Sequence, residues 1–71
     1  MHVKVVELVG ESAYNWKDAV QSAVNEASRT VPNITGVEIY NLTANVQSGR
    51  LQEYKANVKI AYADDGGNAS L

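Results

Sequence analysis

The stretch EYKANVKIAY, residues 53–62, alternates between two kinds of side chain along its whole length. Successive residues of a β-strand point to opposite faces of a sheet, so this alternation predicts a strand with two different faces. One apolar face and one mainly polar face indicate a half-buried antiparallel sheet. The apolar set is Tyr54, Ala56, Val58, Ile60 and Tyr62, and the other set is Lys55, Asn57, Lys59 and Ala61.

A second predicted strand precedes this one and pairs with it. Within residues 36–46, Val37 and Ile39 face one way, while Glu38 and Tyr40 face the other. We expect residues 36–46 and 51–63 to form an antiparallel hairpin. Gly49 in the short link supplies the left-handed backbone that such turns often need.

Residues 15–31 are expected to form the helix that covers the apolar face. Their apolar residues recur at spacings of three and four, which is the period of a helix with one apolar stripe. Asn15 or Ser12 caps the start, and Pro32 ends the helix because proline has no backbone N–H to donate. Trp16 is therefore expected in core or subunit packing. The stripe consists of Trp16, Ala19, Val20, Ala23, Val24, Ala27 and Val31.

The N-terminal segment completes a β-α-β-β order. Residues 2–9 are rich in valine, which favours strands, and residues 10–12 (GES) are expected to break the run. The predicted fold is α+β, a three-stranded antiparallel sheet wrapped over one helix, in a single domain spanning residues 1–63. Residues 64–71 are small and polar, and we expect them to form a flexible C-terminal tail.

Size and composition predict that the chain associates with copies of itself. It has 71 residues, and a domain of this size has a marginal core that usually needs disulfides, a metal or oligomerisation. It has no cysteine and a single histidine, which excludes disulfides and thiolate metal sites. One helix is also too small to cover three strands, so we expect the exposed strand edges to pair with partner subunits.

Charge and motifs exclude several classes of function. The net charge is −2 and the basic residues are interleaved with acids, so a footprint for nucleic acid is absent. No apolar run approaches the roughly 20 residues of a membrane span, and no signal-peptide cleavage site follows the first strand, so a cytoplasmic location is expected. No nucleophile–base pair or glycine-rich phosphate loop occurs, so we expect no enzymatic activity.

The whole pattern resembles the dodecins, from residue 3 to about residue 65. The resemblance rests on the junction LVGES at residues 8–12, on the single alanine-rich helix, and on the alternating strand 53–62. It implies a hollow sphere of twelve identical subunits, with the helices outside and the sheets lining the interior. It also implies binding or storage of a small ligand, because flavin-binding members stack paired flavins between aromatic side chains near the twofold axes.

Two residues depart from the flavin-binding dodecins where the ligand is expected. The stacking tryptophan at the start of the second strand corresponds to Gly36, and the flavin-contacting glutamine of the last strand corresponds to Lys55. Glycine has no ring for a stack that contributes about 0.5–1.5 kcal/mol beyond its buried area, and lysine has donors but no acceptor. The resemblance therefore implies the shell, while FMN, FAD and riboflavin are disfavoured as cofactors.

The face expected to line the interior leaves three interpretations open. Ion pairs of Glu38 with Lys55 or Lys59 would make it a solvated sheet face. A pocket opened by the missing tryptophan would instead hold a small or anionic molecule gripped by Lys55 and Tyr40. In the third interpretation, flavin still binds and Tyr40 replaces the lost stack. The candidate ligand contacts are Gly36, Glu38, Tyr40, Lys55 and Asn57.

Two further alternatives are a calcium site and a purely structural role. Some relatives that lack the tryptophan resemble calcium-binding forms of the fold, and calcium prefers six to eight oxygen ligands. The stretch DDGGN at residues 64–68 lacks the terminal glutamate of a calcium loop. In the structural alternative, the chain oligomerises through its sheet edges and binds no small ligand. The candidate calcium ligands are Glu7, Glu11, Glu38 and Glu53.

Overall fold

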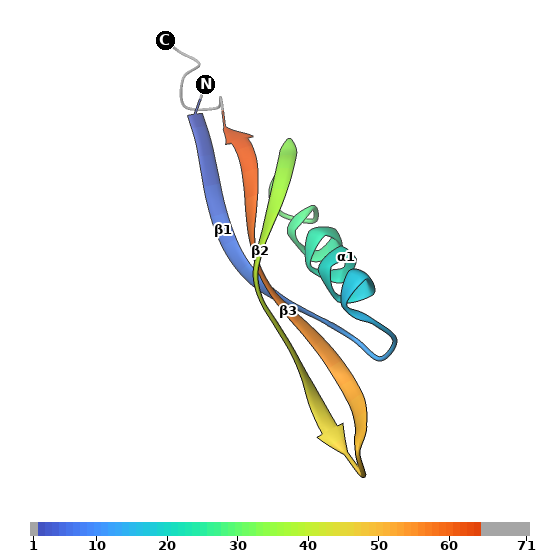
Figure 1. Ribbon diagram of the computed structural model, residues 1–71. Coiled ribbons are helices and arrows are strands. Elements are labelled where there is room, and N and C mark those ends of the chain that lie inside the picture. Colours follow the sequence, from blue (N-terminus) through green and yellow to red (C-terminus); the bar gives the residue numbers. More distant parts are fainter. Residues whose placement is uncertain (1, 65–71) are drawn as a thin grey trace.

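The computed structural model describes residues 2–64. The chain folds in the order β1 (His2–Ser12), α1 (Trp16–Ala27), β2 (Ile34–Gln47) and β3 (Arg50–Asp64). The strands form one antiparallel sheet in the spatial order β1-β3-β2, with β3 in the centre and α1 packed on one face (Figure 1). The predicted α+β fold is therefore confirmed.

A small core lies between α1 and the central strand. Three alanines of the predicted helix stripe pack against three alternate residues of β3. Their short side chains allow the helix backbone to lie close to the sheet. Val6 and Leu8 of β1 are partly buried and border this cluster. The cluster consists of Ala19, Ala23, Ala27, Ala56, Val58 and Ile60.

The first strand is longer than the sequence predicted. β1 continues through Gly10 to Ser12, so the expectation that residues 10–12 break the strand is wrong. Gly10 is buried beneath the helix, where an added Cβ atom would lie 1.9 Å from the backbone oxygen of Ala19. Glycine is needed here because helix and strand backbones approach each other closely.

Hydrogen bonds at the start of α1 identify Asn15, one of the two predicted candidates, as its N-cap. Asn15 Oδ1 accepts a hydrogen bond from the backbone N–H of Asp18 at 2.7 Å, which satisfies one of the free donors of the first turn. Ser12 is buried, and its hydroxyl donates to Asp18 Oδ2 at 2.7 Å. Both polar residues before the helix therefore fix where it begins.

The helix ends earlier than the periodicity predicted. Its last residue is Ala27, whereas the apolar spacing extends to Val31. Pro32 disfavours the helical conformation of the residue before it, so the chain leaves the helix ahead of Val31. The backbone N–H of Thr30 donates to Ala27 O at 3.1 Å, which is the tighter spacing of a closing turn.

A two-residue turn joins β2 to β3 at the predicted place. Ser48 and Gly49 both have positive φ, 54° and 75°, as a tight hairpin turn with right-handed strand twist requires. The strands extend to Gln47 and from Arg50, slightly beyond the predicted ends. Asp64 pairs with His2, so β3 passes the predicted domain boundary at residue 63, and the rest of the predicted tail lies outside the described residues.

Register shifts interrupt the pairing of β2 with β3 at three points, the first between Ile34 and Gly36 and the other two further along the hairpin. Ile39 pairs with Val58 and Asn41 pairs with Asn57, so Tyr40 between them has no partner across the strand. On the other strand, Glu53 is the extra residue and has a φ of 53°. Both are β-bulges, which re-aim side chains and increase the local twist.

The protomer is long and only partly covered. Its radius of gyration is 14.8 Å, against about 11 Å for a compact domain of this length. The far end of the β2–β3 hairpin projects past α1, and the helix packs mainly on β1 and β3 (Figure 1). The helix-side surface of β2 is therefore largely uncovered. The described chain has no helix that is long and apolar enough to cross a membrane.

Candidate ligand-binding face

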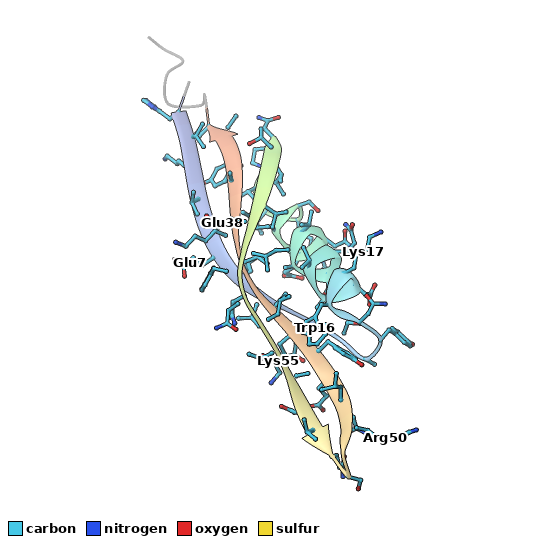
Figure 2. All side chains as sticks on the ribbon, in the orientation of Figure 1. Glu7, Trp16, Lys17, Glu38, Arg50 and Lys55 are labelled. Carbon is cyan, nitrogen blue, oxygen red and sulfur yellow. The ribbon has the colours of Figure 1, made fainter. Side chains whose placement is uncertain are left out.

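The candidate ligand residues lie on the face of the sheet that is turned away from α1, which we call the open face. Figure 2 shows Glu7, Glu38 and Lys55 pointing to this side. The strand register agrees, because residues paired across strands share a face and Lys59 is the partner of both Glu7 and Glu38. The open face includes Glu7, Gly36, Glu38, Tyr40, Lys55, Asn57 and Lys59.

Tyr40 and Lys59 form the best-defined contact on the open face. The ammonium nitrogen of Lys59 lies 5.4 Å from the centroid of the Tyr40 ring, which is within cation–π distance. The Tyr40 hydroxyl donates to Glu7 Oε1 at 3.4 Å, a long and weak hydrogen bond. The bulge at Tyr40 therefore places its ring over the central strand and holds it from two sides.

The ion pair predicted for Glu38 does not form. Lys59 lies directly across from Glu38 but its ammonium group sits over the tyrosine ring. Lys55 is opposite Glu11 and Thr43, four residues further along β3. Among residues 2–64, salt bridges join only Lys4 to Asp64 and Arg29 to Glu26.

Gly36 leaves open space on this face. It lies across from Ala61, and a Cβ atom added at Gly36 would meet no atom within 4 Å. Val5 pairs with the same alanine from the other side, so Val5, Ala61 and Gly36 form a row of apolar residues across the sheet. The protomer can accommodate a larger side chain here, and its absence leaves room for another group.

Lys55 and Asn57 lie well away from Gly36. Ala61, the partner of Gly36, is six positions from Lys55 on β3, which corresponds to roughly 20 Å along a strand. Lys59 is four positions from Lys55, about 13 Å along the strand, whereas Tyr40 lies level with Asn57 and Val58, only two to three positions from Lys55. Within one protomer Lys55 therefore lies nearer to Tyr40 than to Gly36.

Sequence reasoning missed the valines of β1 that share the open face. Val3, Val5 and Val9 are 70%, 54% and 55% exposed and are paired with residues of β3 that face away from the helix. The valine content predicted a strand but not which face each valine occupies. Alternation with Val6 and Leu8, which face the helix, is the signal that would have assigned them.

Trp16 lies on the helix side, between α1 and the sheet (Figure 2). Its indole N–H donates to the backbone oxygen of Thr43 at 2.9 Å, and its ring meets the edge of Tyr54 with centroids 5.0 Å apart. The predicted packing role of Trp16 is confirmed, because the ring ties the first turn of the helix to the hairpin.

The four candidate calcium ligands are spread over the sheet. Glu7 and Glu11 lie on β1, Glu38 lies on β2, and Glu53 lies at the bulge of β3, where its carboxylate accepts a hydrogen bond from Asn45. In the part of the chain that the structure describes, no three acidic or histidine side chains gather as a metal site would require. Most of the stretch 64–68 lies outside those residues.

Comparison with known proteins identifies relatives of the whole fold. The family model described as Dodecin matches residues 3–64. No curated protein matches the chain. Solved structures match over most of their length, and the resemblance extends to both the strand order and the single helix.

Three of these matching structures come from different organisms. A mutant of the dodecin from Thermus thermophilus is 25% identical, with a TM-score of 0.83, over 89% of this chain and 93% of that one. The dodecin from Streptomyces davaonensis is 22% identical, with a TM-score of 0.81, over 89% and 94%. The calcium dodecin from Mycobacterium tuberculosis, described with a calcium-binding site, is 23% identical, with a TM-score of 0.76, over 90% and 91%.

Proposed function

Because the chain belongs to the dodecin family, we propose that it is a non-enzymatic protein that binds or stores a small molecule inside a hollow homododecamer. The open face lines the interior of this shell. Its flavin site is degenerate, since Gly36 and Lys55 occupy the positions of the expected flavin contacts. The proposed ligand contacts are Gly36, Glu38, Tyr40, Lys55 and Asn57.

This proposal rests on the observation that the helix covers only part of the sheet in one protomer. A single helix packs mainly on two of the three strands, and large apolar side chains remain half exposed on both faces of the sheet. The radius of gyration of 14.8 Å is well above that of a compact domain of this size. Association with further copies supplies the burial that one chain lacks.

The open space at Gly36 supports the proposed loss of flavin affinity. A flavin ring that stacks on tryptophan gains both buried area and an aromatic term, and the row of Val5, Ala61 and Gly36 offers only a small part of the area. These three residues are apolar, and Glu7, Glu38 and Lys59 lie two positions away on the three strands. This arrangement suits a small molecule with one apolar surface and a polar edge.

Flavin binding through Tyr40 is the second candidate, and one observation favours it. The Tyr40 ring is half exposed, and its contacts with Lys59 and Glu7 orient it over the open face. The ring lies four residues from Gly36, or about 13 Å along the strand. A flavin stacked on it would therefore occupy a different place from the family position.

Calcium binding and a purely structural shell are the remaining alternatives. The carboxylates of the described residues are separate within one protomer, so a calcium site would need oxygen ligands from several copies. A shell without any ligand would keep the oligomer and show no saturable binding.

Native mass and an absorption spectrum of the purified protein test the proposal. We expect a particle of twelve 7.7 kDa chains without the visible absorption of flavin. Titrations with FMN, riboflavin and calcium then separate the alternatives. A monomer in solution would overturn the shell, and stoichiometric flavin would overturn the degenerate site in favour of Tyr40.

A further inference from the structure

Two rows of paired residues lie next to each other on the open face. The first row is apolar, and a Cβ atom added at its glycine, Gly36, would meet nothing within 4 Å. The second row is charged and lies two positions away, roughly 7 Å along the strands. The apolar row consists of Val5, Ala61 and Gly36, and the charged row consists of Glu7, Lys59 and Glu38.

The lysine of the charged row does not neutralise the carboxylate opposite it. Lys59 is paired with Glu38 across the strands, yet its ammonium nitrogen lies 5.4 Å from the centroid of the Tyr40 ring. Tyr40 follows Glu38 along β2, on the side away from Gly36. Among residues 2–64, no ion pair or hydrogen bond involves the Glu38 side chain. The Glu38 carboxylate is therefore unpaired beside the apolar row.

A ligand that lies on the apolar row would have its polar edge next to this carboxylate. A carboxylate accepts two parallel N–H bonds from a planar cation, and such charge-assisted bonds are stronger than neutral ones. An anionic group in the same place would be repelled by Glu38 and by Glu7 at the other end of the charged row. The open space at Gly36 gives room for the flat part of the ligand.

We propose that Glu38 determines the charge of the ligand, and that the site takes a planar organic cation, such as an aromatic amidine, in preference to an anion. This inference rests on the proposed function and names the chemical class of its ligand. The flat part of the cation lies on Gly36 and Ala61, and its N–H groups donate to Glu38. Tyr40 is a positioning residue, because its ring holds the Lys59 ammonium group away from that carboxylate.

Benzamidine, benzamide and benzoate test the preference, since they share one ring and are cationic, neutral and anionic at pH 7. Ligand-observed NMR with the native oligomer gives the three dissociation constants at low ionic strength, where exposed charges are least screened. We expect benzamidine to bind about fivefold more tightly than benzoate, with benzamide between them. Equal affinities, tighter binding of benzoate, or no binding of benzamidine would overturn the proposal.

Two glutamine variants assign the preference to one carboxylate. Glu38→Gln should weaken benzamidine binding about threefold and leave benzamide binding unchanged, because only the charge is removed. Glu11→Gln is the matched control on the same face, six positions or roughly 20 Å along β1 from Val5, and it should keep the native preference. Equal losses in the two variants would mean that the net charge of the face, and not Glu38, determines the ligand.

A change at Tyr40 tests its positioning role while the carboxylate stays in place. In Tyr40→Leu the Lys59 ammonium group loses its aromatic partner and is free to pair with Glu38. We expect this variant to lose the preference for benzamidine as Glu38→Gln does, and Tyr40→Phe, which keeps the ring, to retain it. A native preference in Tyr40→Leu would overturn the positioning role.

Native mass distinguishes failure of this inference from failure of the proposed function. An assembled particle without a preference for benzamidine overturns the ligand class and leaves the shell intact. A monomer that still prefers benzamidine overturns the shell and supports the ligand class. Calcium is the competitor to include, because displacement of benzamidine by an equal concentration of calcium would mean that Glu38 serves a metal site, and this would overturn the proposal.

Discussion

The two faces of this sheet differ in how closely their residues are packed. On the helix side, β3 presents Val58 and Ile60 to α1, and both are fully buried. On the open face, the same strand presents Lys59, with Gly36 and Val5 on nearby strand positions that nothing covers. The covered face holds the protomer together, and the open face is free to bind or to line a cavity.

Removal of a core side chain should produce the largest effect. We expect Ile60→Ala to lower the free energy of unfolding by about 3 kcal/mol, because it deletes a fully buried side chain and leaves a cavity. Urea denaturation at one fixed protein concentration measures this change. The matched variant Val5→Ala, on the open face, should stay within about 0.5 kcal/mol. Equal losses would mean that the two faces are packed alike in the assembly.

A pair of glycine variants gives the next largest contrast. Gly10→Ala should cost about 2 kcal/mol, because the new Cβ atom would lie 1.9 Å from Ala19 O and the helix must move away. Gly36→Ala should be nearly neutral, since its Cβ atom meets nothing within 4 Å. Thermal unfolding of both variants measures the difference. A neutral Gly10→Ala would show that helix and strand are less closely packed than this structure has them.

The sequence predicted the covered face better than the open one. Periodicity two in residues 53–62 and periodicity three to four in the helix both report burial, so the core of Ala23, Val58 and Ile60 followed directly. Gly10 was read as a strand break because a sequence does not show that a helix backbone passes 1.9 Å from the place of a missing Cβ atom.

The open face depends on features that periodicity does not report. Local twist and side-chain geometry determine the bulge at Tyr40. They also determine that the Lys59 side chain lies over the Tyr40 ring and not beside Glu38. The candidate residues were correctly placed on one face, yet the separation of Lys55 from Gly36 became clear only from the register. Polar residues on an exposed face have many arrangements of similar energy, so sequence alone does not select one.

Filling the space at Gly36 should change ligand binding without unfolding the protein. We expect Gly36→Trp to bind FMN about tenfold more tightly than the native chain, because the ring adds an aromatic stack and buried area. Quenching of flavin fluorescence measures the affinity. Gly36→Ala is the control and should show no gain. If the native chain already binds FMN as tightly as Gly36→Trp, Gly36 does not explain the degenerate site.

The Tyr40 contact should contribute less than any of these. Tyr40→Ala removes the ring from under Lys59 and should lower stability by about 0.5–1 kcal/mol, the range for exposed cation–π pairs. Tyr40→Phe keeps the ring and loses only the 3.4 Å hydrogen bond to Glu7, so we expect it to unfold like the native protein. Urea titration resolves the two variants. A larger loss of stability in Tyr40→Phe than in Tyr40→Ala would show that the hydroxyl group, and not the ring, makes the main contribution.

The salt bridge of Lys4 should have the smallest effect on stability. Lys4 lies where the helix-covered face of the sheet ends. It lies on the same side of β1 as Val6 but remains exposed. Its salt bridge to Asp64 Oδ2, 2.8 Å long, raises the pKa of Lys4 above its ordinary value of 10.5, first through the hydrogen bond and then through the charge. A raised pKa means that the pair favours the folded state below pH 10.5 and that this contribution is lost as the pH rises through the folded-state value.

We expect NMR titration of the Lys4 ammonium group to give a pKa above 10.5 in the native protein and a return toward 10.5 in Asp64→Asn. An unchanged titration in Asp64→Asn would show that Asp64 does not cause the raised pKa of Lys4.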